Sequence, residues 1–324
     1  MGTWHVCGLG LNPGAVTVPL TYVYLFLKLA ARNEERAKSF FQFSGEKGQE
    51  TKGAPESIII FSSKEVITGK SDGKPWSSWQ GRNITDKWFQ TKKQKTPPLT
   101  ICKYLSKLLE KLRDNEFSEF YENKWLKKIY FLEVKHDDFD DCFYKIGVTL
   151  NALKRKEVWT NMIGGTNQIN LALLTAGSFS ATLARYYYVF QSNILLLHPE
   201  TEKPNMKNPR GFIKNMDRWR DLPIFHLDLS PLIHDLNELF QGREKVNVRE
   251  IENVLEQHEH TKQYLAKLRG RMIILEGDVA RQTNLLMLLN AMRMKIQEKN
   301  VQDVSKWKKW ASDKGILHEF DLDD

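Results

Sequence analysis

The segment 159–168 constrains the fold most, because it joins a β-rich run, two adjacent glycines and the start of a helical pattern. Gly164 and Gly165 let the backbone turn tightly and approach a neighbouring group closely. Three polar residues begin the predicted helix 167–179 or precede it, where backbone N–H groups are free: Thr166, Asn167 and Gln168. The turn either only connects strand and helix or binds an anion, for which phosphate is the natural candidate.

A second unit of this kind lies near the N-terminus. Residues 4–9 are a predicted strand, 16–31 are a predicted apolar helix, and the intervening loop and strand end contribute Gly8, Gly10, Leu11, Asn12, Pro13 and Gly14. Ligands of open parallel sheets collect beyond the carboxyl ends of the strands, so the two loops face one pocket if their strands are close. The third glycine of the dinucleotide fingerprint is missing, so we expect no nicotinamide and no other cofactor.

Short β-rich runs alternate with helical patterns from residue 1 to about 230, which is typical of a doubly wound α/β domain. The further predicted strands are 57–62, 128–134, 158–162 and 182–190 with 194–197. Strand 57–62 ends in Ser62 and Ser63, which we expect at the same rim as the glycine loops. The polar stretch at about 69–98 contains Trp76, Trp79 and Trp88, and it is predicted to be an insertion.

Past Pro231 the β pattern largely stops, and residues 231–324 are predicted to form a second, mainly helical domain. Apolar spacing marks one helix at 246–255 and another at 264–268, and 273–282 is typical of a hairpin. Helix, helix, wing is the order of a winged helix-turn-helix. Basic residues on or just after the second helix make DNA a possible partner, although such modules also dimerise or cover ligands: Lys262, Lys267, Arg269 and Arg271.

Composition places the chain among globular proteins with a net charge of +8, which agrees with a polyanionic ligand. Cys7, Cys102 and Cys142 stand alone in apolar stretches, so we expect buried thiols and a reducing compartment. The apolar run 16–31 is too short to span a bilayer and contains Pro19, so a cytoplasmic protein without membrane contact is predicted. No cysteine or third ligand accompanies His258 and His260, and no metal site is expected.

The pairing of the loop 10–14 with the turn 164–167 on a Rossmann-like sheet, followed by a winged-helix module, resembles the CRISPR-associated Rossmann fold (CARF) proteins of the ring-nuclease type. The strand ending in Ser62 and Ser63 and the Asp137-Asp138-Phe139 opening of a helix fit the same family. The resemblance covers residues 1 to about 230, and the C-terminal module matches in outline. It implies a homodimer with one two-fold site for a cyclic oligoadenylate, most commonly cyclic tetra-adenylate.

Ring nucleases of this type cleave the ring without a metal, through attack of a ribose 2′-hydroxyl on the adjacent phosphorus. By the motif match, Asn12, Thr166 and Asn167 are the candidate catalytic residues, and Asn12 and Asn167 stand where relatives have serine and lysine. An amide brings no positive charge, and Arg185 and Lys135 are candidates to supply it. The ligand-binding residues by this resemblance are Gly8, Gly10, Leu11, Pro13, Gly14, Ser62, Ser63, Gly164, Gly165 and Gln168.

Three functions remain open at this point. The first is a ring nuclease that linearises the ring and damps type III CRISPR signalling. The second is a transcriptional regulator that binds the ring without cleavage and binds DNA through its winged helix. The third is a Rossmann-like nucleotide-binding protein outside this family.

Overall fold

The computed structural model describes residues 2–41, 53–76, 96–113, 117, 126, 128–191, 196–199, 209–211, 218–222, 229–259, 262–298 and 300–322. Trp79, Trp88, most of the predicted insertion and the first half of the run 194–197 lie outside these residues, and so does His260. The described start of the insertion is a small hairpin of β3 (Lys70–Ser71) and β4 (Lys74–Pro75).

A seven-stranded sheet forms the centre of the protein, in the order β12-β5-β2-β1-β6-β7-β8. Its five inner strands are mutually parallel: β1 (Thr3–Leu9), β2 (Pro55–Ser62), β5 (Lys128–Glu133), β6 (Glu157–Asn161) and β7 (Leu183–Val189). The edges are antiparallel strands, β8 (Trp219–Leu222) and β12 (Leu317–Asp321). The prediction of a Rossmann-like α/β sheet is confirmed.

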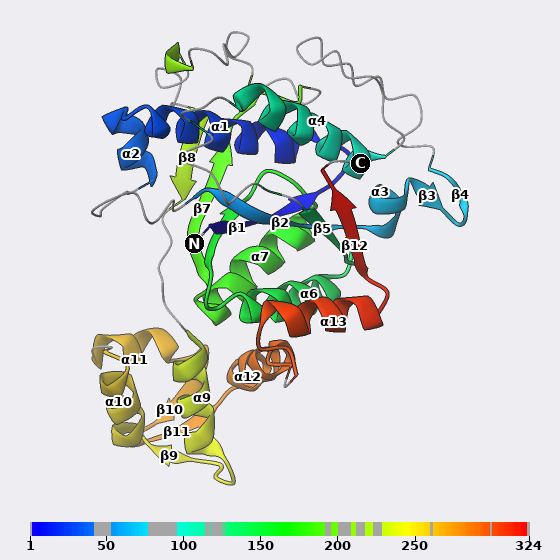
Figure 1. Ribbon diagram of the computed structural model, residues 1–324. Helices are drawn as coiled ribbons and strands as arrows, with labels where there is room; N and C mark the ends of the chain where they lie inside the picture. Colours follow the sequence, from blue (N-terminus) through cyan, green and yellow to red (C-terminus); the bar gives the residue numbers. More distant parts are fainter. Residues whose placement is uncertain are drawn as a thin grey trace.

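Helices cover both faces of this sheet (Figure 1). One face carries α1 (Gly14–Ala31), α2 (Glu35–Phe41) and α4 (Pro97–Leu112), and the other carries α6 (Phe139–Ala152), α7 (Asn167–Ser180) and α13 (Val304–Asp313). A short helix, α3 (Lys64–Thr68), follows β2. Two apolar clusters fill the layers, one on each side, so the inner strands are buried on both faces as their continuous apolar runs predict.

Helix α1 is long and apolar enough to cross a membrane by composition, but in this structure it is a core helix with 94% of its length buried. It packs between the sheet and α4, and its Thr21 hydroxyl lies 3.0 Å from the Tyr104 hydroxyl. The three cysteines are buried free thiols, as predicted. Burial raises the pKa of the Cys7 thiol to about 12, which makes it a poor nucleophile at neutral pH.

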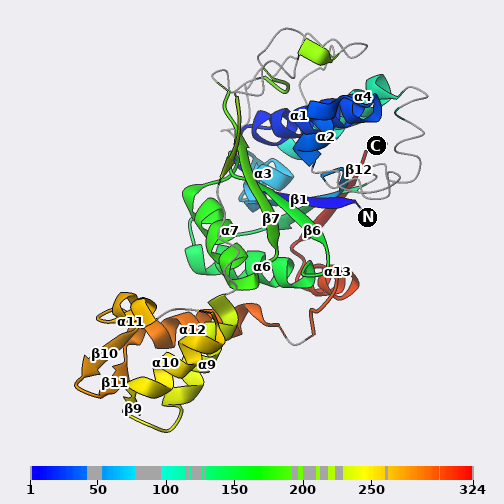
Figure 2. The ribbon, with the colours of Figure 1, turned by 90° about the vertical axis from the view of Figure 1, so that its left-hand side faces the viewer.

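Residues 229–296 form a second body beside the sheet (Figure 2). Its order is α9 (Leu229–Phe240), β9 (Val246–Asn247), α10 (Val248–Gln257), α11 (Lys262–Leu268), β10 (Ile273–Glu276), β11 (Val279–Gln282) and α12 (Asn284–Ile296). Strands β10 and β11 are the predicted hairpin, and β9 completes a three-stranded sheet. The two predicted helices are α10, which an Asn247–Glu250 capping box begins, and α11.

The chain then returns to the main sheet. Residues 304–321, which the sequence placed in a second domain of 231–324, therefore belong with the main sheet. Helix α13 packs on α6, where Trp307 donates through Nε1 to the Thr149 hydroxyl at 2.9 Å. Strand β12 pairs along β5, with Leu317 opposite Leu132. Strand β12 is hard to predict from the sequence, because it has five residues and lies at the edge of the sheet. Its solvent-facing positions are polar, so it lacks the continuous apolar run of the inner strands.

Candidate functional site at the switch point of the sheet

The two glycine loops lie on adjacent strands, at the point where the order of the sheet reverses. Along the chain the parallel strands β1, β2 and β5 extend the sheet in one direction, and β6 and β7 extend it in the other, starting again beside β1. Helix α1 leaves β1 on one face, whereas α7 leaves β6 on the opposite face. A crevice at the carboxyl ends of such strands is the usual binding place of open α/β sheets.

Three glycines bring the two loops into direct backbone contact. A Cβ atom on Gly164 would lie 1.9 Å from the Gly8 carbonyl oxygen, and one on Gly8 would lie 2.8 Å from the Gly164 carbonyl oxygen. Gly165 has φ +84°, in the left-handed region that favours glycine. In contrast, a Cβ on Gly10 would meet nothing within 4 Å. Packing therefore explains Gly8, Gly164 and Gly165, while Gly10 has open space above it.

Asn161, which the sequence analysis did not single out, ties the two units together at the end of β6. Its Nδ2 donates to the Ala15 carbonyl at 2.6 Å, and its Oδ1 accepts from the Ile163 N–H at 3.0 Å. The Ala15 carbonyl is available because its helical partner four residues on is Pro19, which has no N–H. A proline inside a helix that follows a glycine loop was the signal that could have identified this contact.

The start of α1 uses its own N–H groups within the loop. The Gly14 N–H donates to Asn12 Oδ1 at 3.1 Å, and the Ala15 N–H donates to the Asn12 carbonyl at 3.1 Å. Pro13 is buried as the residue before the helix, and Leu11 packs on the core. The Asn12 Nδ2 group has no acceptor among the described residues, so it is a donor that this loop can offer to a ligand.

The start of α7 differs, because its first amides are not used internally by the described residues. Thr166 is the N-cap, and its hydroxyl accepts weakly from the Ile169 N–H at 3.5 Å. The same hydroxyl donates to the His136 carbonyl at 2.7 Å, so its proton is already engaged. The N–H groups of Asn167 and Gln168 have no acceptor in the described part of the chain, and Asn167 is exposed. An anion would be attracted here by these amides and by the helix dipole.

The loop after β5 lies next to this helix start through the Thr166–His136 hydrogen bond. Its backbone is held on both sides, because the Lys135 N–H donates to Asp141 Oδ2 at 2.7 Å and the Lys135 carbonyl accepts from the Asp138 N–H at 3.0 Å. The side chains of Lys135 and His136 are exposed, and the described residues provide neither with an acidic partner. Lys135 therefore stays a candidate for the missing positive charge.

Ser62 and Ser63 lie at the same rim, as predicted, but Ser62 is buried and structural. Its hydroxyl donates to the Leu9 carbonyl at 2.7 Å, and its carbonyl accepts from the Val134 N–H at 2.9 Å. Ser63 is buried and precedes α3 without a side-chain cap bond. The carboxyl ends of β1, β2, β5 and β6 thus lie at one rim.

Arg185 does not supply the charge at this rim. Its guanidinium forms a two-bond contact with Asp221 at 2.6 and 2.7 Å and donates to the Phe40 carbonyl at 2.9 Å. It also stacks over the rings of Phe40 and Trp159, at 4.4 and 4.6 Å from their centroids. The hypothesis that Arg185 replaces the family lysine is therefore wrong, because Asp221 on β8 neutralises it.

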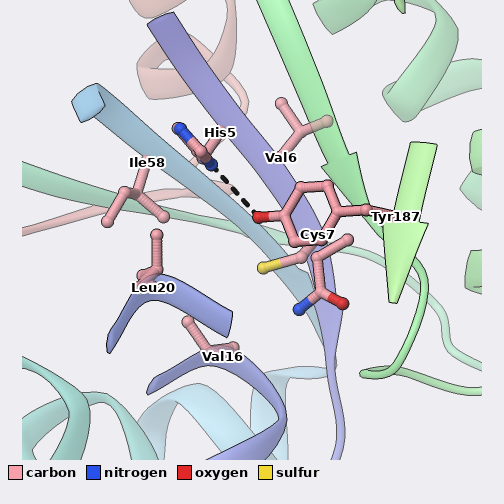
Figure 3. A pocket seen from close by; sticks show the side chains of 8 residues that line it. His5, Val6, Cys7, Val16, Leu20, Ile58 and Tyr187 are labelled. Atoms are coloured by element: carbon pink, nitrogen blue, oxygen red, sulfur yellow. Dashed lines mark hydrogen bonds between the residues drawn. The ribbon is translucent and has the colours of Figure 1, made fainter. Parts of the chain in front are cut away.

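Below the rim, eight residues line a cavity of about 10 Å³, which holds at most one water molecule. Figure 3 shows the side chains of His5 and Tyr187 facing each other in this cavity. His5 Nδ1 lies 3.2 Å from the Tyr187 hydroxyl oxygen. His5 Nε2 lies 2.9 Å from the Gly53 carbonyl, which can only accept, so Nε2 carries the proton and Nδ1 accepts from Tyr187. Burial lowers the pKa of His5 to about 4, and the charge of Arg185 adds to this while the bond to Gly53 opposes it.

No metal-binding group of three or more histidine, cysteine or acidic side chains occurs among the described residues. His258 instead donates through Nε2 to Asp235 Oδ2 at 2.8 Å.

Comparisons with known proteins give a close sequence relative and a distant structural one. No protein-family model matches the sequence. An uncharacterized protein of Archaeoglobus fulgidus is 43% identical over 333 residues, and the match covers 100% of this chain and 99% of that protein. A structure of Enterococcus italicus Csm6 bound to cyclic hexa-2′-fluoro-hexa-dAMP is 11% identical with a TM-score of 0.34. That match covers 95% of this chain but only 56% of the Csm6 chain.

Proposed function

We propose a function for the family to which this chain and the Archaeoglobus fulgidus protein belong: its members are CARF-type ring nucleases that bind a cyclic oligoadenylate at the switch point and linearise it. Cyclic tetra-adenylate is the proposed ring. The observation that carries the proposal is the contact between Gly8 and Gly164, which joins the two glycine loops at one rim. This is the arrangement that the resemblance to CARF proteins requires.

The polar groups at the rim fit a phosphodiester. The amides of Asn167 and Gln168 and the free Nδ2 group of Asn12 are donors without acceptors among the described residues. Such donors, fixed before the ligand arrives, would hold a phosphate and stabilise charge that develops on it. Thr166 would act by positioning, because its hydroxyl is bonded to the His136 carbonyl. Gly10 would leave room for the ring, since nothing lies within 4 Å of its Cβ position.

A second copy of the chain is the proposed partner, with the two-fold axis close to α7. Leu171 and Leu174 are 54% and 46% exposed, one and two turns after Asn167 on this helix. Two exposed leucines on one helix face beside the rim would be covered if two α7 helices packed together. A two-fold interface presents the same rim twice, which suits a ring with its own symmetry.

The test uses purified protein with radiolabelled cyclic tetra-adenylate in EDTA, resolving products on a gel and bound ring by filter retention. Linear products from the wild type, lost on Asn12→Asp, which keeps the Oδ1 acceptor of the Gly14 N–H but removes the Nδ2 donor, would support the ring nuclease. Retention without products would support a sensor that does not cleave. If the protein neither retains the ring nor forms linear products, the proposal for this ring is contradicted. Cyclic hexa-adenylate would then be tested in the same way.

DNA binding by residues 229–296 is the second candidate function, since a ring-responsive regulator would need it. The order helix, strand, helix, helix, strand, strand, with β11 between β9 and β10, is that of a winged helix, and we propose this assignment. Lys267, Arg269 and Arg271 are exposed on α11 or just after it, without acidic partners among the described residues; the side chain of Lys262 lies outside them.

The hairpin itself argues against a strongly basic wing. Glu276 at its tip forms ion pairs with Lys245 at 2.7 Å and with Arg281 at 3.1 Å, so both cations are neutralised within the protein. Contact with DNA would therefore depend on the residues after α11. A gel shift with promoter DNA at several salt concentrations tests this: binding that weakens with salt, and that Arg269→Gln with Arg271→Gln reduces, would support the regulator.

A further inference from the structure

The rim lacks an obvious proton donor, although the proposed reaction needs one. When a ribose 2′-oxygen attacks phosphorus, the leaving 5′-oxygen must receive a proton, and the amides of Asn12 and Asn167 cannot deliver it. Thr166 is also unsuitable, because its only proton is bonded to the His136 carbonyl. The donor must therefore come from a third element next to the two glycine loops.

The loop after β5 is that element, and the structure fixes its backbone firmly. Asp141 Oδ2 accepts from the Lys135 N–H at 2.7 Å, and the Cys142 thiol donates to the Lys135 carbonyl at 3.2 Å. Asp138 caps α6 by accepting from the Asp141 N–H at 3.1 Å. The Thr166 bond then joins the next residue, His136, to the start of α7. The loop is thus attached to α6 on one side and to the proposed phosphate site on the other.

His136 differs from the other histidines of the described chain. His5 is kept neutral mainly by burial, and its ring nitrogens bond to the Gly53 carbonyl and the Tyr187 hydroxyl. His258 pairs with Asp235. His318, on the edge strand β12, has its Nε2 atom 3.7 Å from Glu133 Oε2. His234 accepts from Arg293, and His198 Nδ1 lies 2.8 Å from the Pro199 carbonyl. His136 is exposed and has no side-chain partner among the described residues, and an imidazole is the side chain that most often transfers protons in catalysis.

We propose that His136 is the general acid of the ring cleavage and that Lys135 neutralises a phosphate oxygen beside it; this inference rests on the proposed function. In the step, the bond from the ribose 2′-oxygen to phosphorus forms and the bond from phosphorus to the 5′-oxygen breaks. The 2′-hydroxyl releases its proton to water, and the imidazolium of His136 gives one to the 5′-oxygen. The product is a linear oligoadenylate with a 2′,3′-cyclic phosphate, and no co-reactant is consumed.

The acidic side chains around this loop are mostly engaged with partners other than His136. Asp141 is engaged by the Lys135 N–H and by Lys145 at 2.9 Å, and Asp138 caps the helix. Asp137 is exposed beside His136, and the ring's own phosphates would be the further negative charges near this loop when the ring is bound.

The test compares two substrates under single-turnover conditions: cyclic tetra-adenylate, and the same ring with sulfur in place of the bridging 5′-oxygens. A thiolate leaves without a proton, so only the oxygen substrate needs the acid. We expect His136→Gln to cleave the oxygen ring about 100-fold more slowly or worse and to cleave the sulfur ring at nearly the wild-type rate. His318→Gln, on edge strand β12, is the matched control and should cleave both rings normally.

Two results would overturn the inference while leaving the proposed function intact. One is an unchanged rate of His136→Gln on the oxygen ring, and the other is an equal loss on both rings, since that indicates a positional defect. Wild-type protein that retains the ring without cleaving it would also overturn the inference, although binding would stand. Absence of retention by the wild type would instead remove the proposed function itself.

Discussion

Acidification should destabilise this protein through one buried histidine. His5 is 2% exposed in β1 and is neutral in the folded state, with its pKa lowered to about 4 mainly by burial. In the unfolded chain its pKa is that of a free histidine, about 6.5. As pH falls below about 6.5, His5 binds a proton in the unfolded chain but stays unprotonated in the folded protein. Stability is therefore fully present above pH 6.5 and decreases until pH reaches about 4.

The size of the effect follows from the separation of the two pKa values. A difference of about 2.5 units corresponds to about 3.4 kcal/mol once both states are protonated. Between pH 7 and pH 5 the linkage relation gives a loss of about 2 kcal/mol in the free energy of unfolding. This is a large part of the stability of a typical domain, which lies at about 5–15 kcal/mol.

Urea unfolding followed by tryptophan fluorescence at pH 7 and pH 5 measures this loss in the wild type and in His5→Gln. Glutamine keeps an N–H donor for the Gly53 carbonyl but does not titrate, so the variant should lose about 2 kcal/mol less than the wild type over this range. An NMR titration of the His5 ring in the folded wild type provides an independent check. A ring that protonates near pH 6.5, or equal losses in both proteins, would refute the reasoning.

Three further outcomes follow from the rim and from α7. Gly164→Ala should lower the free energy of unfolding by about 3 kcal/mol or more, because its Cβ would meet the Gly8 carbonyl, whereas Gly10→Ala should leave urea unfolding unchanged. Asn161→Ala should cost about 1–3 kcal/mol. In a Pro19→Ala background that cost should fall, as a double-mutant cycle would show, because the new N–H satisfies the Ala15 carbonyl. Leu171→Glu should convert the proposed dimer to a folded monomer in sedimentation experiments; an unchanged mass would exclude α7 from the interface.

The sequence predicted the elements of the sheet well, because buried parallel strands are continuous apolar runs and each is followed by a helical stripe. The strands 57–62 and 128–134 correspond to β2 and β5, and the hairpin at 273–282 corresponds to β10 and β11. The two edge strands were missed for a shared reason. Strands β8 and β12 are short, run antiparallel and expose polar side chains, so neither has the apolar pattern of the inner strands.

The candidate site was predicted as a set of loops, but the roles of its residues depend on contacts between segments far apart in the chain. Ser62 and Thr166 look like ligand donors in the sequence, yet both hydroxyls donate to backbone carbonyls. Arg185 looks like a free cation until β8 brings Asp221 against it. No local pattern contains this information, because each partner lies between 30 and 53 residues away.

The rim combines a backbone that several contacts hold in place with a side chain, that of Asn167, that none of these contacts uses. Gly8 and Gly164 lock the two loops together, Asn161 joins β6 to the carbonyl that Pro19 leaves open, and Thr166 holds the loop after β5. A ligand would therefore meet donors that are already ordered, and little entropy would be lost on binding. Because none of these contacts uses the side chain of Asn167, that position can change between amide and cation without disturbing the loops. The chemistry at this rim can thus vary within a family while its shape remains the same.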